Sequence, residues 1–137
     1  MEFLRLLLLP FSVVYGLITG VRNLLFDLGV LQSRRYDIPV ISVGNLSTGG
    51  TGKTPHVEYL IRLLSPFNKV STLSRGYGRR TRGYLMAKAG STAANIGDEP
   101  MQYFRKFPEA GVHVDEKRRR GIENILKTAP ETDVILL

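Results

Sequence analysis

The sequence predicts an α/β fold, with a mostly parallel sheet and flanking helices, preceded by a separate apolar helix at the amino terminus. Three observations predict this class. Short apolar runs alternate with segments of helical periodicity, a glycine-rich stretch joins one such run to one such segment, and a charge-free run of sixteen residues lies near the amino terminus.

Composition limits the classes of protein that are possible. The chain has 137 residues, of which 43% are hydrophobic, and this suits one globular domain of roughly a hundred residues beside the apolar run. The formal net charge of +7 favours an anionic partner such as lipid headgroups, nucleic acid or a phosphorylated substrate, but does not choose among them. Because there is no cysteine, disulfides, thiolate metal sites and cysteine nucleophiles are excluded.

The charge-free run, Leu6 to Val21, is flanked by Arg5 and Arg22 and reads as a segment that meets a membrane. It is shorter than the about 20 residues of a span, and a narrow polar stripe on a helical wheel favours an interfacial anchor. A short span and a helix packed on protein remain alternatives, whereas a signal peptide is disfavoured because no small-residue cleavage site follows. Pro10 is expected to end or kink any helix begun at Glu2.

A polar, basic break at Ser33–Asp37 marks the expected domain boundary. The sequence therefore predicts a membrane-associating helical segment over 1–35 and a nucleotide-binding core over 36–137. Arg34 and Arg35 suit contact with lipid phosphates, or they belong to a solvated linker.

The predicted buried strand Ile38–Val43 leads into a glycine-rich loop that ends in Lys53-Thr54. Glycines permit close backbone approach to a phosphate chain, the lysine reaches the β- and γ-phosphates, and the Thr54 hydroxyl ligates Mg²⁺. Ser47 stands where the pattern G-x-x-x-x-G-K-[ST] has its first glycine, which weakens the match slightly. The predicted nucleotide-binding residues are Asn45, Ser47, Thr48, Gly49, Gly50, Thr51, Gly52, Lys53 and Thr54.

Beyond this loop, apolar residues at helical spacing predict a helix from Lys53 to about Ser65, followed by a strand over Lys69–Leu73. Strand, loop, helix and strand together form a right-handed βαβ unit. The segment Tyr84–Lys88 is predicted to pair with Lys69–Leu73 as the return strand of a hairpin.

The connecting stretch, Ser74–Gly83, is rich in glycine and arginine and follows the carboxyl end of a strand, where open α/β sheets bind ligands. Its arginines suit a substrate phosphate, with Tyr77 packing on a ring. A solvated hairpin whose charges only aid solubility is the alternative.

Gly97-Asp98-Glu99-Pro100 opens a predicted helix over Met101–Phe107. Asp98 is placed as its N-cap, and this structural role alone explains an aspartate there. A general base near a phosphate site is the functional alternative. The residues alone leave these two roles evenly balanced.

The last third predicts a strand at Val112–Val114, a helix over Asp115–Lys127 and a strand over Thr132–Leu137. Kinases and nucleotide hydrolases of this class carry an acidic residue after such a strand to hold Mg²⁺. The apolar residues are present and the acid is not, so we expect an amino-terminal fragment with no kinase turnover of its own. His56 and His113 have no partner at metal-ligand spacing and are read as ordinary.

The ordered combination of an apolar amino-terminal helix, V-G-N-L-S-T-G-G-T-G-K-T-P, S-R-G-Y-G-R, G-D-E-P and D-V-I-L-L resembles the tetraacyldisaccharide 4'-kinase family over the whole chain. The resemblance implies transfer of the ATP γ-phosphate to the 4'-hydroxyl of a tetraacylated disaccharide 1-phosphate, the lipid A precursor. It also implies Mg²⁺ as a cofactor and a location at the cytoplasmic face of the bacterial inner membrane, peripheral or monotopic.

The resemblance further assigns roles to individual residues. Asp98 resembles the family's base for the sugar hydroxyl, and Lys53 and Thr54 resemble its phosphate and Mg²⁺ contacts. The residues assigned to the substrate side are Arg75, Tyr77, Glu99 and Arg118, the last of them to phosphate stabilisation.

Two other classes compete with this reading. Membrane-associated ATPases of the partitioning or division-positioning type share G-G-x-G-K-T, but they usually carry a second lysine where this chain has Thr48. A nucleic-acid-binding module would use the Arg75–Arg82 loop, which lacks interleaved aromatic platforms for stacking bases. Nucleic acid is therefore not an expected partner, and the sequence leaves the oligomeric state open.

Overall fold

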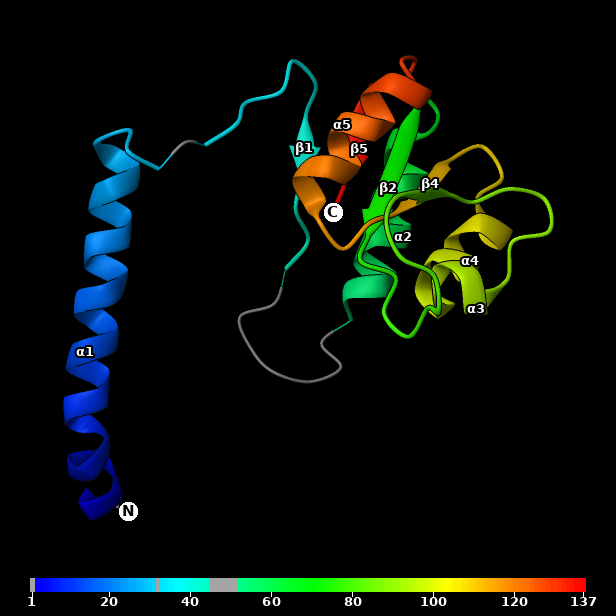
Figure 1. Ribbon diagram of the computed structural model, residues 1–137. Coiled ribbons are helices and arrows are strands. Elements are labelled where there is room, and N and C mark those ends of the chain that lie inside the picture. The colour runs from blue at the N-terminus through cyan, green and yellow to red at the C-terminus, as the bar shows by residue number, and fades with distance from the viewer. Residues whose placement is uncertain (1, 32, 45–51) are drawn as a thin grey trace. The chain divides into compact units, whose positions relative to one another are not determined.

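The computed structural model describes residues 2–31, 33–44 and 52–137, which form two compact units, 1–35 and 36–137. The first unit consists mainly of helix α1 (Glu2–Asp27), and the second holds all the strands (Figure 1).

Pro10 was expected to end or kink a helix begun at Glu2; helix α1 continues through it, so the first of these alternatives is wrong. A proline inside a helix removes one backbone donor and strains the preceding turn. The helix nevertheless continues to Asp27.

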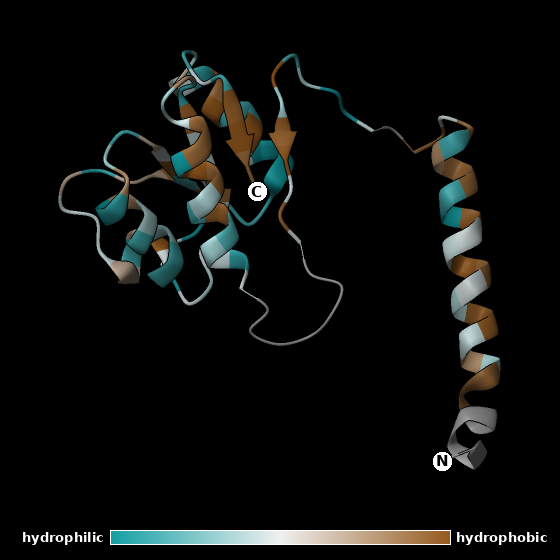
Figure 2. Ribbon diagram, turned by 180° about the vertical axis from the view of Figure 1, so that it is seen from behind, coloured by the Kyte–Doolittle hydropathy of each residue, from teal (hydrophilic) through white to brown (hydrophobic). Residues whose placement is uncertain are grey.

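From Leu8 onward, the apolar side chains of α1 lie mostly at the surface of their unit. Phe11 and Tyr15 are each 70% exposed, and the stretch Leu8–Asp27 is long and apolar enough to cross a membrane by length and composition. Figure 2 shows hydrophobic residues along this helix. Sixteen charge-free residues are fewer than the about 20 that a span needs, but the apolar stretch of the helix is longer than that run.

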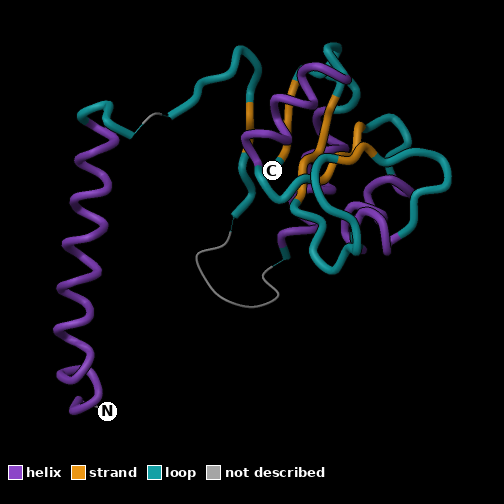
Figure 3. Tube along the Cα trace, viewed as in Figure 1, coloured by secondary structure: helices purple, strands orange, loops and turns teal. Residues whose placement is uncertain are grey.

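The second unit is built around a five-stranded sheet in the order β1-β5-β2-β4-β3. Its strands are orange in Figure 3. All neighbouring strands are parallel except β3, which is antiparallel to β4. The strands are β1 (Val40–Ile41), β2 (Val70–Ser74), β3 (Leu85–Met86), β4 (Gly111–Val114) and β5 (Val134–Leu136). The helices are α2 (Lys53–Leu64), α3 (Ala93–Ile96), α4 (Asp98–Lys106) and α5 (Arg118–Thr128). The α/β class predicted from the sequence is confirmed.

Two features of the sheet differ from the sequence prediction. Strand β1 is a short edge strand with Ile41 exposed, because it pairs with β5 alone, whereas a buried strand over Ile38–Val43 was expected. The segment around Leu85 pairs with β4 and not with β2, because β4 and β5 occupy the two sides of β2. The predicted hairpin is therefore wrong, and the Ser74–Gly83 loop crosses to the far edge of the sheet.

The core lies on both faces of the sheet, as the alternation along β5 requires. Val134 and Leu136 pack with Val57 and Ile61 of α2, while Ile135 between them packs with Ile125 of α5. Helix α2 begins and ends where its 3.6-residue apolar pattern predicts. The cluster on the α2 face also contains Tyr103 and Phe107 at the end of α4.

Two helices begin at different residues from those predicted. Gly97 occupies the N-cap of α4, so Asp98 is the first helical residue and not the cap. Helix α5 begins at Arg118 because Asp115, fully buried, accepts the Lys117 N–H at 2.8 Å and holds the chain in a turn before the helix.

Candidate active site

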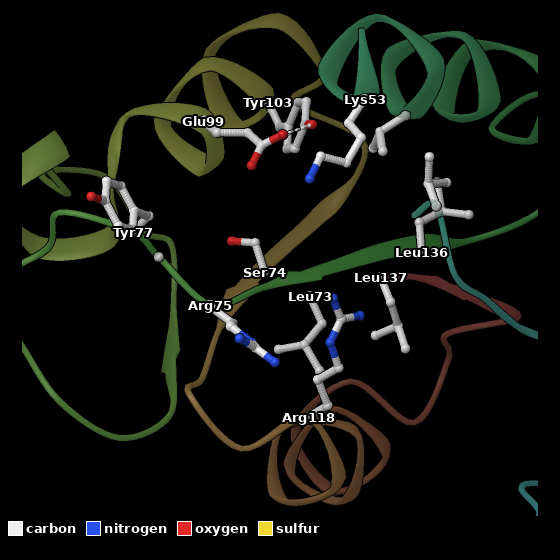
Figure 4. A pocket seen from close by; sticks show the side chains of 13 residues that line it. Lys53, Leu73, Ser74, Arg75, Tyr77, Glu99, Tyr103, Arg118, Leu136 and Leu137 are labelled. Atoms are coloured by element: carbon white, nitrogen blue, oxygen red, sulfur yellow. Dashed lines mark hydrogen bonds between the residues drawn. The ribbon is translucent and has the colours of Figure 1, made fainter. Parts of the chain in front are cut away.

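A cavity of about 400 Å³ opens at the carboxyl ends of β2 and β5, where α2, α4 and α5 all begin. Leu73, Leu136 and Leu137 form part of its apolar wall. Because the polypeptide turns from strand to helix at this edge, helix N-termini and loop residues surround the space. Its polar lining comprises Lys53, Ser74, Arg75, Tyr77, Glu99, Tyr103 and Arg118 (Figure 4).

One side of the cavity is organised by Glu99. Its Oε1 atom accepts a hydrogen bond from Thr54 Oγ1 at 2.9 Å and another from Tyr103 Oη at 2.7 Å. Burial, and then the bond to Glu99, raise the pKa of Tyr103, so the phenol stays protonated and donates. In Figure 4 the Lys53 amino group extends into the cavity on this same side. A carboxylate, a hydroxyl and an ammonium group therefore lie together at the start of α2.

The opposite side is basic. Arg75 and Arg118 both line the cavity there (Figure 4). Burial lowers the pKa of Arg118, and the positive charge of Arg75 lowers it further. The two guanidinium groups repel each other and give this side of the cavity a positive potential. An anion that enters the cavity would reduce that repulsion.

Ser74 and Tyr103 were missed by the sequence reasoning. The Ser74 hydroxyl is buried at the end of β2 and has no hydrogen-bond partner among the described residues, while its side chain points into the cavity in Figure 4. Tyr103 stands one helical turn after Glu99. This i, i+4 spacing after a candidate carboxylate was the signal that could have identified it.

The two adjacent carboxylates are separated by the start of α4. Successive residues of a helix point about 100° apart, so Glu99 faces the cavity while Asp98 lines a different hollow with Met101, Gln102 and Arg105. The structure thus brings together Lys53, Thr54, Glu99, Arg75 and Arg118, with Tyr77 at the rim. Asp98 is exposed just outside this group.

The glycine-rich loop itself falls largely outside the described residues. This applies to Asn45, Ser47, Thr48, Gly49, Gly50 and Thr51. Gly52 is described, and its φ of 75° at the N-cap of α2 favours glycine. Its carbonyl oxygen lies 2.7 Å from His56 Nδ1.

The Ser74–Gly83 loop touches the start of α4 through backbone atoms. Gly97 has a φ of 96°, and a methyl group there would lie 3.0 Å from the carbonyl oxygen of Tyr77. Gly76 has a φ of 66°, and a methyl group there would lie 2.8 Å from the carbonyl oxygen of Ile96. Both positions therefore need glycine for conformation and for space.

Comparison with known proteins shows the family to which the chain is similar. The family model described as tetraacyldisaccharide-1-P 4'-kinase matches residues 4–137. A tetraacyldisaccharide 4'-kinase of Flavobacterium johnsoniae is 53% identical over 137 residues, which are 100% of this chain and 40% of the relative. Another of Parabacteroides distasonis is 56% identical over 134 residues, which cover 96% of this chain and 36% of the relative.

A solved structure is similar as well. The crystal structure of LpxK from Aquifex aeolicus in complex with ATP superposes with a TM-score of 0.78 at 40% sequence identity. The match covers 98% of this chain and 43% of that one. The chain thus spans about 40% of the length of the Flavobacterium relative and a similar share of the solved structure.

Proposed function

The chain belongs to the tetraacyldisaccharide-1-P 4'-kinase family, and we propose that a protein carrying it transfers the γ-phosphate of ATP to the 4'-hydroxyl of a tetraacyldisaccharide 1-phosphate. The observation that carries the proposal is the cavity at the start of α2, where Lys53 faces Glu99 and two arginines. Phosphoryl transfer is catalysed mainly by positioning and charge stabilisation, and this combination of charges suits it.

In this proposal the nucleotide phosphates lie on the loop that leads into α2. Lys53 neutralises charge on the β- and γ-phosphates, and the N-terminal end of α2 adds partial positive charge. Asn45, Ser47, Thr48, Gly49, Gly50, Thr51 and Gly52 supply the backbone and side-chain donors around them. The solved relative from Aquifex aeolicus is in complex with ATP, and this supports ATP as the nucleotide.

The residues of the cavity fit Mg²⁺. Magnesium prefers hard oxygen ligands and usually shares them between a protein side chain or two, phosphate oxygens and water. Thr54 Oγ1 and Glu99 Oε1 are such oxygens, 2.9 Å apart and next to Lys53. A bound ion would supply positive charge that neutralises the charge developing on the phosphates. We propose Thr54 as its protein ligand.

We propose Asp98 as the base that accepts the proton of the sugar hydroxyl, with Arg75, Tyr77, Glu99 and Arg118 on the substrate side. The exposed position of Asp98 beside the cavity allows a substrate that covers the start of α4 to reach it. A general base must lie within hydrogen-bond distance of the proton once substrate is bound. It need not do so in the free protein.

We further propose that the protein acts at the cytoplasmic face of the bacterial inner membrane, held there by α1 as a peripheral or monotopic anchor. A substrate with four acyl chains stays in the bilayer, so the enzyme must work at its surface. The apolar stretch Leu8–Asp27 and the net charge of +7 support binding to an anionic membrane.

A chimera tests the proposed activity. The aligned part of the Flavobacterium johnsoniae enzyme is replaced by this chain, and transfer of ³²P from ATP to tetraacyldisaccharide 1-phosphate is measured. Turnover above that of the same chimera with Lys53→Ala supports the proposal. A chimera that melts cooperatively and binds ATP but transfers no phosphate refutes it.

The same chimera tests the role of Asp98. If Asp98 is the base, Asp98→Ala lowers kcat by about 10²–10⁴-fold and leaves ATP binding nearly intact. Arg105 lines the same hollow about two turns further along α4, so Arg105→Ala is the matched control and should leave kcat within about twofold. Near-normal kcat with Asp98→Ala would retire the assignment.

A further inference from the structure

A second cavity, of about 540 Å³, lies beside the candidate active site. It shares Arg75 and Gly76 with the first cavity, so the two are neighbours on the Ser74–Gly83 loop. Five cationic side chains line the second cavity against one acid, Glu116. The five are Arg75, Arg79, Arg82, Lys117 and Arg120.

Two of these cations are already paired and form a rigid frame. Arg120 binds the fully buried Asp115 through two bonds of 2.7 and 2.8 Å. Burial raises the pKa of Asp115, but hydrogen bonds from Arg120 and from the Lys117 N–H, with the nearby positive charges, outweigh it and leave the pKa below its ordinary value. The carboxylate is therefore ionised and holds Arg120 in place.

Arg79 is the second part of this frame. Its side chain is only 3% exposed, pairs with Glu116 and donates to the Gly83 carbonyl oxygen at 2.7 Å. Its Nη1 group is buried with no hydrogen-bond partner among the described residues. This guanidinium group is therefore a buried donor that lacks an acceptor among the described residues.

The other three cationic side chains of this cavity are candidates for binding a ligand. Arg75, Arg82 and Lys117 are exposed and form no ion pair within 33–44 and 52–137. Three like charges around one hollow repel one another unless an anion enters. A phosphate monoester, with three oxygens and a charge near −2, matches three separate donors better than a carboxylate does.

We propose that this second cavity binds the 1-phosphate of the disaccharide substrate, with Arg82 and Lys117 as its main contacts and Arg75 bridging the two cavities. The inference rests on the proposed function, because the substrate named by the family carries one phosphate already and gains another at its far sugar. Two adjacent anion sites joined through Arg75 suit a ligand with one phosphate at each end.

The test titrates the ¹⁵N-labelled full chain in detergent micelles with glucosamine 1-phosphate, inorganic phosphate and glucosamine, and records backbone amide shifts. Glucosamine 1-phosphate should shift the amides of Arg82, Gly83 and Lys117, inorganic phosphate should do so more weakly, and glucosamine should not. Equal affinity for inorganic phosphate would overturn the assignment to a sugar-linked phosphate, and shifts confined to Lys53 and Thr54 would overturn the site.

Paired double variants separate this site from general charge attraction. Arg82→Gln with Lys117→Gln should raise the Kd for glucosamine 1-phosphate by about tenfold or more, since charge-assisted hydrogen bonds are lost. Arg80→Gln with Lys127→Gln removes the same charge from exposed residues outside both cavities and should leave the Kd unchanged. An equal rise in both pairs would overturn the proposal.

A separate titration with ATP keeps the two proposals apart. ATP should shift the amides around Lys53 and Thr54 in the parent chain and in both double variants. If ATP fails to bind while glucosamine 1-phosphate still shifts Arg82 and Lys117, the kinase proposal fails and the anion site stands.

Discussion

The two units of the chain use apolar residues in opposite ways. In the first unit the large apolar side chains of α1 from Leu8 onward are mostly more than half exposed, as for Leu17 and Ile18. In the second, Ile61 and Ile125 are completely buried between helices and sheet. Apolar side chains therefore stabilise the fold of the second unit. In the first unit they stay exposed and can bind another apolar surface.

This difference shows why hydrophobic content alone could not define the domain. The apolar residues of 36–137 are patterned for two faces of a sheet, whereas those of α1 cover nearly the whole circumference of a helix. A helix that is hydrophobic on most sides is stable only when something apolar surrounds it.

The largest effect should follow removal of residues 1–35. Flotation with vesicles of phosphatidylglycerol and phosphatidylethanolamine should show binding reduced by about a thousandfold or more, because the exposed apolar surface is lost. The melting temperature of 36–137 should change little, since its core lies within that unit. Equal flotation of the truncated and intact chains would refute the anchor.

Matched isoleucine substitutions sharpen the comparison. Ile61→Ala should lower the free energy of unfolding by about 2–5 kcal/mol, the usual cost of an emptied core position. Ile18→Ala, at an exposed position of α1, should lower it by less than about 0.5 kcal/mol and weaken vesicle binding instead. Urea titration and flotation of both variants give the two readouts, and a large stability loss from Ile18→Ala would contradict the division.

The second unit should also hold the nucleotide site by itself. Lys53→Ala should weaken ATP binding by about tenfold or more, because a charge-assisted contact to phosphate is removed. Lys88→Ala, which changes an exposed lysine beside another hollow, is the control and should have no effect. Calorimetry that finds equal ATP affinity for Lys53→Ala and the parent chain would refute the phosphate-loop interpretation.

The smallest effect should be a pH dependence confined to the second unit. Burial lowers the pKa of the fully buried His113 to about 4, from an ordinary value of 6.5. Below pH 6.5 the unfolded chain therefore binds a proton that the folded chain rejects, and stability falls as the pH drops from 6.5 toward 4. The slope contributed by this group should be at most about 1.4 kcal/mol per pH unit.

His113→Asn is the variant that checks this assignment. The substitution removes the titrating ring that lies 2.9 Å from the Tyr84 hydroxyl, so the variant should be less stable at pH 7. Urea titrations between pH 4.5 and 7 should nevertheless give a flatter profile than the parent. An unchanged slope would assign the pH dependence to other groups.

Local patterns predicted local features well. The spacing of Val57 and Ile61 predicted α2, and the residues around Gly52 and Lys53 predicted a nucleotide-binding edge and a family that comparison confirms. These features are encoded in neighbouring residues, so periodicity and motif spacing are enough to find them. The roles of the individual site residues stay predictions.

Long-range pairing was beyond local patterns. Nothing near Leu85 encodes that its partner is Val114, because the choice depends on which strands already occupy the two sides of β2. The inward direction of Glu99 likewise depends on whether α4 begins at Asp98 or at Met101, a difference of a single turn. Helix boundaries are the least reliable part of a sequence prediction, and here a boundary decides which carboxylate faces the cavity.

The close contact between Gly76 and Gly97 has a consequence for how the sequence can evolve. Twenty-one positions apart in the sequence, they meet so closely that Gly97 has the Gly76 Cα within 3.1 Å of the place where its own methyl group would lie. A mutation that adds a side chain at one of them moves the backbone of the other motif. We therefore expect the S-R-G-Y-G-R and G-D-E-P motifs to evolve together, because a substitution at Gly76 or Gly97 is tolerated only if the other motif accommodates it.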